Sequence, residues 1–159
     1  MNRRSGTFMT IATLVLMALG SAVIAADSNI GIWKMNPAKS KYSPGPAPKS
    51  QTVTIEAWGA DGFKYVADGV NAEGKPMHWA FQVKYDGKSM PFTGNPDVDT
   101  ISSKRIDANT VESTTQLKGK PAMTSKVAIS ADGRTRTLTQ TGKNAKGQDV
   151  NNVVVYDKQ

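Results

Sequence analysis

The chain has 159 residues, a net charge of +7 from 20 lysines and arginines against 13 aspartates and glutamates, and no cysteine. Without cysteine it can form neither a disulfide framework nor a thiolate zinc site, so a folded domain must be stabilised by its core. The basic residues are scattered along the chain instead of forming a block, which argues against a nucleic-acid-binding arm.

The chain begins with the three parts of a secretion leader. Arg3 and Arg4 form a basic start, an apolar run extends from Phe8 to Ala18, and small residues precede Ala26. A transmembrane anchor would need about twenty apolar residues, which is more than this run offers. We expect cleavage after Ala25, with cleavage after Ala26 as the alternative.

The expected organisation is therefore a signal peptide at 1–25 and a single domain at 26–159. A domain of that length can build one core. Removal of the leader would release a soluble chain with no stable membrane insertion, in the periplasm of a bacterium or secreted from it.

After the leader, alternation of apolar and polar residues with a period of two recurs to the end of the chain, and helical periodicity is absent. A proline-rich connection, 36–50, follows the first strand. The ten predicted strands are 30–35, 51–58, 63–70, 76–85, 89–93, 100–106, 110–118, 122–130, 135–143 and 150–158.

Asp-Gly pairs between these segments, such as Asp61-Gly62, Asp86-Gly87 and Asp132-Gly133, are typical of hairpin turns. Successive hairpins without helices predict an all-β fold with an antiparallel up-and-down sheet. Closure of such a sheet removes its unpaired edges, which favours a β-barrel of about eight to ten strands over an open sheet or a sandwich.

The bulky apolar side chains of the first half share one face of their strands. In 76–85, for example, Met77, Trp79 and Phe81 alternate with residues that are polar or small: His78, Ala80 and Gln82. The candidate ligand-binding residues on the predicted inner face are Trp33, Tyr65, Met77, Trp79, Phe81 and Phe92.

The later strands carry smaller, hydroxyl-bearing residues. Ser113 and Thr115 share a face, as do Ser125 and Val127, and a threonine row at 135, 137, 139 and 141 stands opposite Arg136, Leu138 and Gln140. Closure would bring large aromatic residues against small ones. Two interpretations follow: a solid interior with complementary packing, or an amphipathic cavity for a small ligand.

Gly31-Ile32-Trp33, at the head of the first strand, resembles the lipocalin and fatty-acid-binding-protein group of barrels (calycin-like). The resemblance implies that Trp33 packs across the barrel floor. The segment 153–158 resembles the closing strand of the fatty-acid carriers, but Val154 stands where they have the arginine that clamps the carboxylate. This departure weakens the case for a fatty-acid ligand.

The segment from Trp33 to Ser40 is also similar to periplasmic barrels that hold polyisoprenoids. The chain beyond the leader resembles, over nearly all its length, a group of uncharacterised exported bacterial proteins with the pattern Trp-Lys-x-Asn-Pro-x-Lys-Ser-Lys and a closing Asn-Asn-Val-x-Val-Tyr. That resemblance implies an exported barrel and carries no function.

The sequence gives little support for a catalytic site or a metal-binding site. His78 is the single histidine; alternation places it on the polar face, and no local carboxylate or nucleophile elbow supports a catalytic triad. Asp97 and Asp99 form the densest acidic spot, but one loop offers too few oxygens for calcium. We assign no catalytic residue, metal ligand or cofactor.

The leading hypothesis is a non-enzymatic, exported barrel that binds a small hydrophobic or amphipathic molecule. The alternative is a solid-core envelope protein that acts through protein or surface interactions. A third hypothesis, a hydrolase, requires His78 to lie beside a carboxylate within a cleft.

Overall fold

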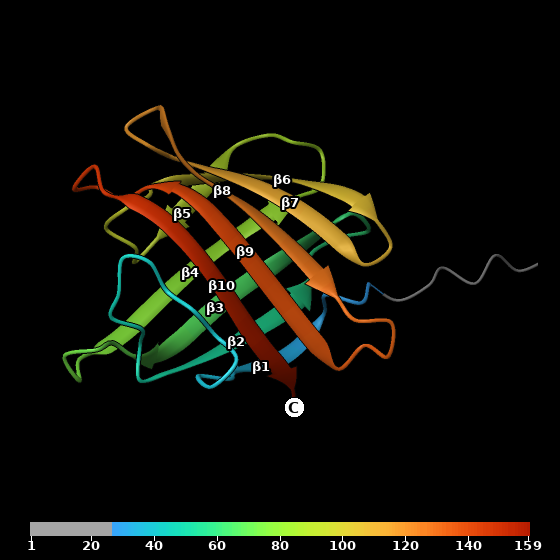
Figure 1. Ribbon diagram of the computed structural model, residues 1–159. Helices are drawn as coiled ribbons and strands as arrows, with labels where there is room; N and C mark the ends of the chain where they lie inside the picture. Colours follow the sequence, from blue (N-terminus) through green and yellow to red (C-terminus); the bar gives the residue numbers. More distant parts are fainter. Residues whose placement is uncertain (1–26) are drawn as a thin grey trace, which may run out of the picture.

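The computed structural model describes residues 27–159, so the leader predicted at 1–25 lies outside the described part. The described chain contains ten strands (Figure 1) and no helix long and apolar enough to cross a membrane. The strands are β1 (Gly31–Met35), β2 (Ser50–Ala57), β3 (Gly62–Val70), β4 (Pro76–Lys84), β5 (Met90–Thr93), β6 (Thr100–Asp107), β7 (Thr110–Leu117), β8 (Lys120–Ile129), β9 (Thr135–Lys143) and β10 (Asp149–Lys158).

All ten predicted strands are present, each within two residues of the expected ends. Neighbouring strands pair antiparallel in chain order, and β1 pairs with both β2 and β10, so the sheet closes into a barrel. The prediction of an antiparallel up-and-down barrel is confirmed.

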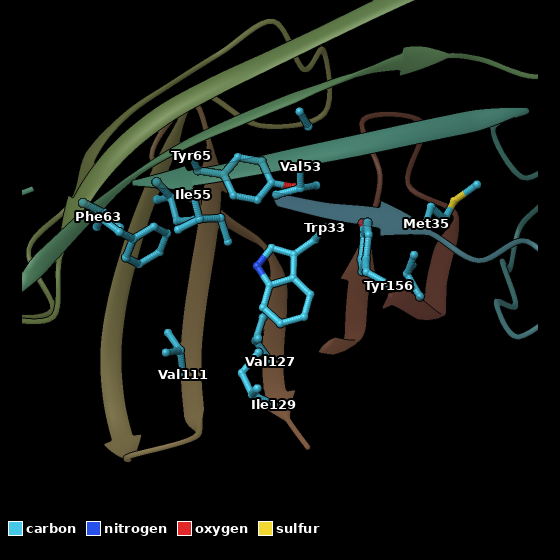
Figure 2. Packing of buried hydrophobic residues seen from close by; sticks show 14 residues of the cluster. Trp33, Met35, Val53, Ile55, Phe63, Tyr65, Val111, Val127, Ile129 and Tyr156 are labelled. Atoms are coloured by element: carbon cyan, nitrogen blue, oxygen red, sulfur yellow. The ribbon is translucent and has the colours of Figure 1, made fainter. Parts of the chain in front are cut away.

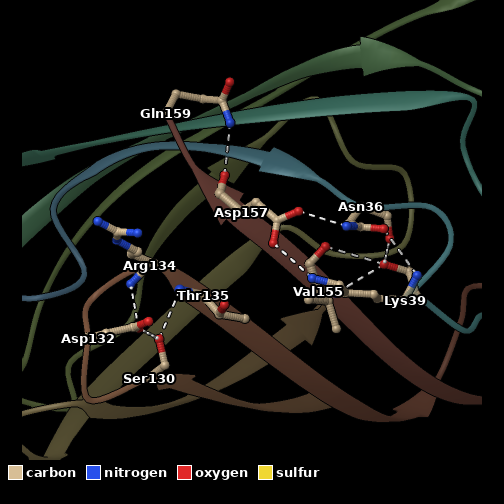
Figure 3. Close-up of polar contacts among 10 residues, drawn as sticks. Asn36, Lys39, Ser130, Asp132, Arg134, Thr135, Val155, Asp157 and Gln159 are labelled. Atoms are coloured by element: carbon tan, nitrogen blue, oxygen red, sulfur yellow. Dashed lines mark hydrogen bonds and ion pairs between the residues drawn. The ribbon is translucent and has the colours of Figure 1, made fainter.

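Closure occurs at a short seam between the two ends of the chain, where Trp33 pairs with Lys158 and Met35 with Tyr156. Beside it, the Asn36 side-chain amide donates to Asp157 at 2.7 Å, and the Lys39 ammonium lies 3.4 Å from the same carboxylate (Figure 3). The hydrogen bond from Asn36, together with the positive charge of Lys39, lowers the pKa of Asp157. These contacts stabilise the seam on the outer surface of the barrel.

The hairpin between β8 and β9 shows why aspartate and glycine occur in the turns. The Asp132 carboxylate accepts hydrogen bonds from the Ser130 hydroxyl and the Arg134 amide (Figure 3), and Gly133 adopts φ +68°. The turn predicted at Asp61-Gly62 is shifted: Gly59 has the positive φ, and Gly62 already begins β3.

Because the strands alternate in direction, the connections fall into two groups at opposite ends of the barrel. One end, the mouth, carries 36–49, 71–75, 94–99, 118–119 and 144–148. The other end, the floor, carries 58–61, 85–89, 108–109 and 130–134, together with the segment that precedes β1. The proline-rich connection therefore lies at the mouth.

The packed core surrounds Trp33, which is fully buried (Figure 2). Its indole Nε1 donates to the Asn29 carbonyl at 2.9 Å, and Val53, Ile55 and Tyr156 belong to the same buried cluster. Complete burial of an indole contributes several kcal/mol, at about 25 cal/mol per Å² of apolar surface. This core anchors β1, the short strand on which closure depends.

Candidate ligand-binding site

The barrel interior contains a cavity of about 400 Å³. Its lining includes residues of the mouth, among them Pro44, Pro46 and Pro48 of the proline-rich connection, and extends to Asn29 at the floor. The interior is therefore hollow over part of its length, as the cavity interpretation requires.

One side of the cavity, the aromatic wall, consists of Tyr65, Met77, Trp79, Phe81 and Phe92. The Phe81 ring stacks on Tyr65 with centroids 4.5 Å apart and lies 4.8 Å from Phe92. These contacts place the rings of β3, β4 and β5 in one apolar surface. The structure thus brings five of the six candidate residues together.

Trp33, the sixth candidate, is not among the residues that line the cavity. It is wholly enclosed in the packed core, and its one polar atom is satisfied by Asn29. Its inward orientation agrees with the sequence pattern, but the barrel is filled around it.

The opposite side, the hydroxyl wall, consists of Ser113, Thr115 and Ser125 on β7 and β8. The Ser113 hydroxyl lies 2.7 Å from that of Ser103, and the Thr115 hydroxyl donates to the Met123 carbonyl at 3.2 Å. The predicted pairing of large aromatic residues with small hydroxyl-bearing ones across the barrel is present.

On β9 the threonine row does not contribute to the hydroxyl wall. Arg136, Leu138 and Gln140 face the cavity instead. The cause is register: Arg136 pairs with the buried residues Tyr156 and Ile129, and directly opposed residues share a face of the sheet. A buried arginine is thus placed inside the barrel, a residue that sequence reasoning missed.

Arg136 is only 4% exposed. Its Nε donates to the Asn29 side-chain oxygen at 3.2 Å, and its guanidinium lies 5.3 Å from the centre of the Tyr156 ring. Nη1 has no hydrogen-bond partner, and within residues 27–159 no carboxylate forms an ion pair with this side chain. The guanidinium stays charged in proteins, so the cavity lining contains a fixed cation without a counter-ion.

Tyrosine hydroxyls supply further polar groups. The Tyr156 hydroxyl donates to the Gln51 side-chain oxygen at 2.6 Å. Burial raises the pKa of Tyr42, Tyr65 and Tyr156, so these phenols stay neutral. The positive charge of Arg136 is therefore not compensated by a phenolate.

The free energy of unfolding is expected to fall as the pH rises above about 10. In the folded barrel burial raises the pKa of Tyr65 and Tyr156, whereas tyrosines of the unfolded chain ionise near their ordinary pKa of 10.0. Above that pH the unfolded chain binds fewer protons than the folded one, which favours unfolding; below it the full contribution is present. Urea denaturation at about pH 8 and about pH 10.5 measures the difference. Tyr65→Phe removes one such group and should reduce the fall; an unchanged fall would contradict this account.

His78 does have a carboxylate partner, which sequence reasoning did not find. Its Nδ1 lies 2.7 Å from Asp68, its cross-strand neighbour on β3. Both side chains are about two-thirds exposed on the outer wall, so the pair is outside any cleft. The cleft that the hydrolase hypothesis requires is not found at His78.

Asp97 and Asp99 bind backbone amides at the mouth. The Asp97 carboxylate accepts from the Ala145 amide at 2.8 Å and that of Asp99 from the Lys118 amide at 2.7 Å, which ties three mouth connections together. Across residues 27–159, no three acidic, histidine or cysteine side chains are grouped so that they could hold a metal ion.

The chain matches no protein-family model and no curated protein, but solved structures share its fold. A redesigned β-barrel, b11L5F_LGL, aligns with 85% of this chain and 95% of its own at a TM-score of 0.51 and 12% identity. The wild-type fluorescent protein UnaG aligns with 83% and 98% at a TM-score of 0.54 and 15% identity. These likenesses show the fold, a closed antiparallel β-barrel.

Proposed function

We propose that this barrel binds, without catalysis, a small amphipathic molecule that has an apolar body and an acidic group. The observation that carries the proposal is a hollow interior whose lining includes a buried arginine without a counter-ion in residues 27–159. The apolar body lies between the aromatic wall and the hydroxyl wall, and the acidic group binds the guanidinium of Arg136.

The electrostatics of the cavity support an anionic ligand. A charged side chain removed from water without a counter-ion costs several kcal/mol, and within residues 27–159 the contacts of the Arg136 guanidinium are a hydrogen bond to a neutral amide and a cation–π contact with a ring. A ligand carboxylate, sulfonate or phosphate would offset this cost with a charge-assisted hydrogen bond.

The size of the cavity fits the same class. About 400 Å³ lies within the range of small-molecule sites, which combine mostly apolar surface with a few polar groups. The proline-rich connection contributes to the lining at the mouth. The proposal therefore includes entry of the ligand at the mouth, past Pro44, Pro46 and Pro48.

The proposal includes export. The leader at 1–25 would deliver the domain 26–159 to the periplasm or the medium, where the ligand would be an envelope or environmental molecule. The intact mass of the protein recovered from those fractions tests it, because an uncleaved chain in the cytoplasm contradicts export.

Filling the cavity is expected to weaken ligand binding. Ser125 is 9% exposed and forms part of the hydroxyl wall, so Ser125→Phe places a ring in the ligand space. We expect about tenfold weaker binding, since the displaced ligand surface loses about 25 cal/mol per Å² of apolar burial. Fluorescence titration with N-phenyl-1-naphthylamine, the neutral probe, measures the change.

The matched control is Thr124→Phe, which adds the same ring at the adjacent exposed residue of β8, on the outer face. Its affinity should equal that of the unchanged protein. Equal weakening by both variants, or by neither, would argue against binding in the cavity.

A further inference from the structure

The four residues before β1, Asp27–Ile30, are held at the floor by side chains from several strands; we call this segment the floor clasp. The Ile30 amide donates to the Asp27 carbonyl at 3.0 Å, which folds the segment into a turn. The Ser28 hydroxyl donates to the Ala108 carbonyl in the connection between β6 and β7 at 2.9 Å. The segment is therefore joined to the far side of the barrel.

Asp27 lies at the outer end of the floor clasp and anchors it to the barrel. Its carboxylate accepts a hydrogen bond from the Tyr85 hydroxyl at 2.6 Å and forms an ion pair with Arg105. The Arg105 guanidinium also lies over the Tyr85 ring, 4.2 Å from its centroid. Burial and the hydrogen bond to Asp27 together raise the pKa of Tyr85 to about 12, so this donor keeps its proton.

Asn29 is the inner end of the floor clasp and is only 2% exposed. The backbone amide of Asn29 donates a hydrogen bond to the Asp27 carboxylate at 3.0 Å, and its backbone carbonyl accepts one from the Trp33 indole. With the backbone held on both sides, its side-chain oxygen accepts the hydrogen bond from Nε of Arg136. This is the one hydrogen bond that Arg136 makes through its side chain within the described chain.

We infer that Asn29 is a positioning residue that makes the cavity selective for anions, and that the floor clasp sets its place. The inference rests on the proposed function. An asparagine oxygen is a neutral acceptor, so it fixes one edge of the guanidinium and leaves the positive charge uncompensated. The guanidinium then keeps its charge for a ligand acid. A carboxylate in the same place would form an ion pair and compete with the ligand.

Asn29→Asp tests this inference with a change of nearly equal size. Two probes of the same skeleton are used: the neutral probe, and 8-anilinonaphthalene-1-sulfonate, which adds one sulfonate. The variant should bind the sulfonate probe about tenfold more weakly, because the introduced carboxylate supplies the charge-assisted partner in place of the ligand, while its affinity for the neutral probe stays within about twofold.

Asp27→Ala provides a second test at a distance from the cavity. It removes the acceptor of Tyr85, Arg105 and the Asn29 amide at once. Once Asn29 is released, the sulfonate probe should lose a few-fold in affinity and the neutral probe should not, since Asn29 positions Arg136, the charged side chain of the cavity. Circular dichroism checks that both variants are folded.

The outcomes separate the inference from the proposed function. If the unchanged protein binds neither probe, the proposed function fails. If it binds both and Asn29→Asp retains full affinity for the sulfonate probe, the positioning role fails alone. Equal loss of both probes in Asn29→Asp and Asp27→Ala would show a merely structural clasp and also overturn the inference. In an Arg136→Met background, Asn29→Asp should no longer change the ratio of the two affinities.

Discussion

Replacement of Arg136 by methionine is expected to weaken binding of the sulfonate probe about 10- to 100-fold and to leave the neutral probe within about twofold. A hydrogen bond to a charged group contributes about 1.5–3 kcal/mol, which corresponds to that range because about 1.4 kcal/mol is tenfold in affinity. Methionine fills a similar volume without charge. Titration of both probes measures the ratio, which is the quantity that the proposal predicts.

The matched control is Arg134→Met, which removes a positive charge from an exposed turn two residues earlier at the same end of the barrel. Its ratio of affinities should remain that of the unchanged protein. If Arg134→Met lowers sulfonate binding as much as Arg136→Met does, the effect comes from overall charge, and the anion site in the cavity is contradicted.

The stability of Arg136→Met gives a second distinction. The variant loses the hydrogen bond between the charged guanidinium and Asn29, worth about 1.5–3 kcal/mol, but also removes a buried cation that lacks a counter-ion, whose desolvation costs several kcal/mol. We therefore expect the free energy of unfolding to stay level or to rise. A variant that binds the ligand more weakly but is equally or more stable is expected if the charge of Arg136 serves binding. A large destabilisation would show instead that Arg136 stabilises the fold at the floor of the barrel.

Trp33→Ala is expected to lower the free energy of unfolding by about 3–5 kcal/mol, the usual cost of truncating a buried indole. Trp33 is fully buried, and its removal also frees the Asn29 carbonyl. Urea denaturation followed by circular dichroism measures the loss. Since Trp33 lies outside the cavity, the fraction that remains folded should still bind the neutral probe.

Trp58→Ala is the control for the tryptophan prediction. Trp58 is the first residue after β2 and is half-buried, with the Lys84 ammonium 5.8 Å from its ring centroid. We expect it to cost less than half as much as Trp33→Ala, because large costs arise from cavities in the core. Similar losses in the two variants would contradict the assignment of Trp33 as the centre of that core.

The aromatic wall could be predicted because strand geometry and composition agree there. In β4 the alternation of Met77, Trp79 and Phe81 with polar or small residues leaves one choice of inner face, and closure of the barrel brings that face to Tyr65 and Phe92. For Trp33 the alternation gives the direction of the side chain. It does not say where along the axis the barrel is filled, which depends on the volumes of neighbours contributed by β2 and β10.

Arg136 and Asn29 were missed for different physical reasons. On β9 both faces are polar, so hydropathy favours burying the threonines over burying a charge; only the register with Tyr156, a long-range property, decides otherwise. Asn29 lies before the first strand, in a segment without periodicity. Its role depends on contacts with residues that are distant in the chain, and no local pattern carries that information.

The seam between β1 and β10 also bears on how the protein reaches its folded state. Asn36 and Asp157, which meet there, are separated by 121 residues, so the barrel cannot close before the last strand is available. Long-range antiparallel pairing slows folding, because the entropy of a long loop must be lost first. Closure of the barrel is therefore expected to be a late step of folding, after the hairpins between neighbouring strands have formed.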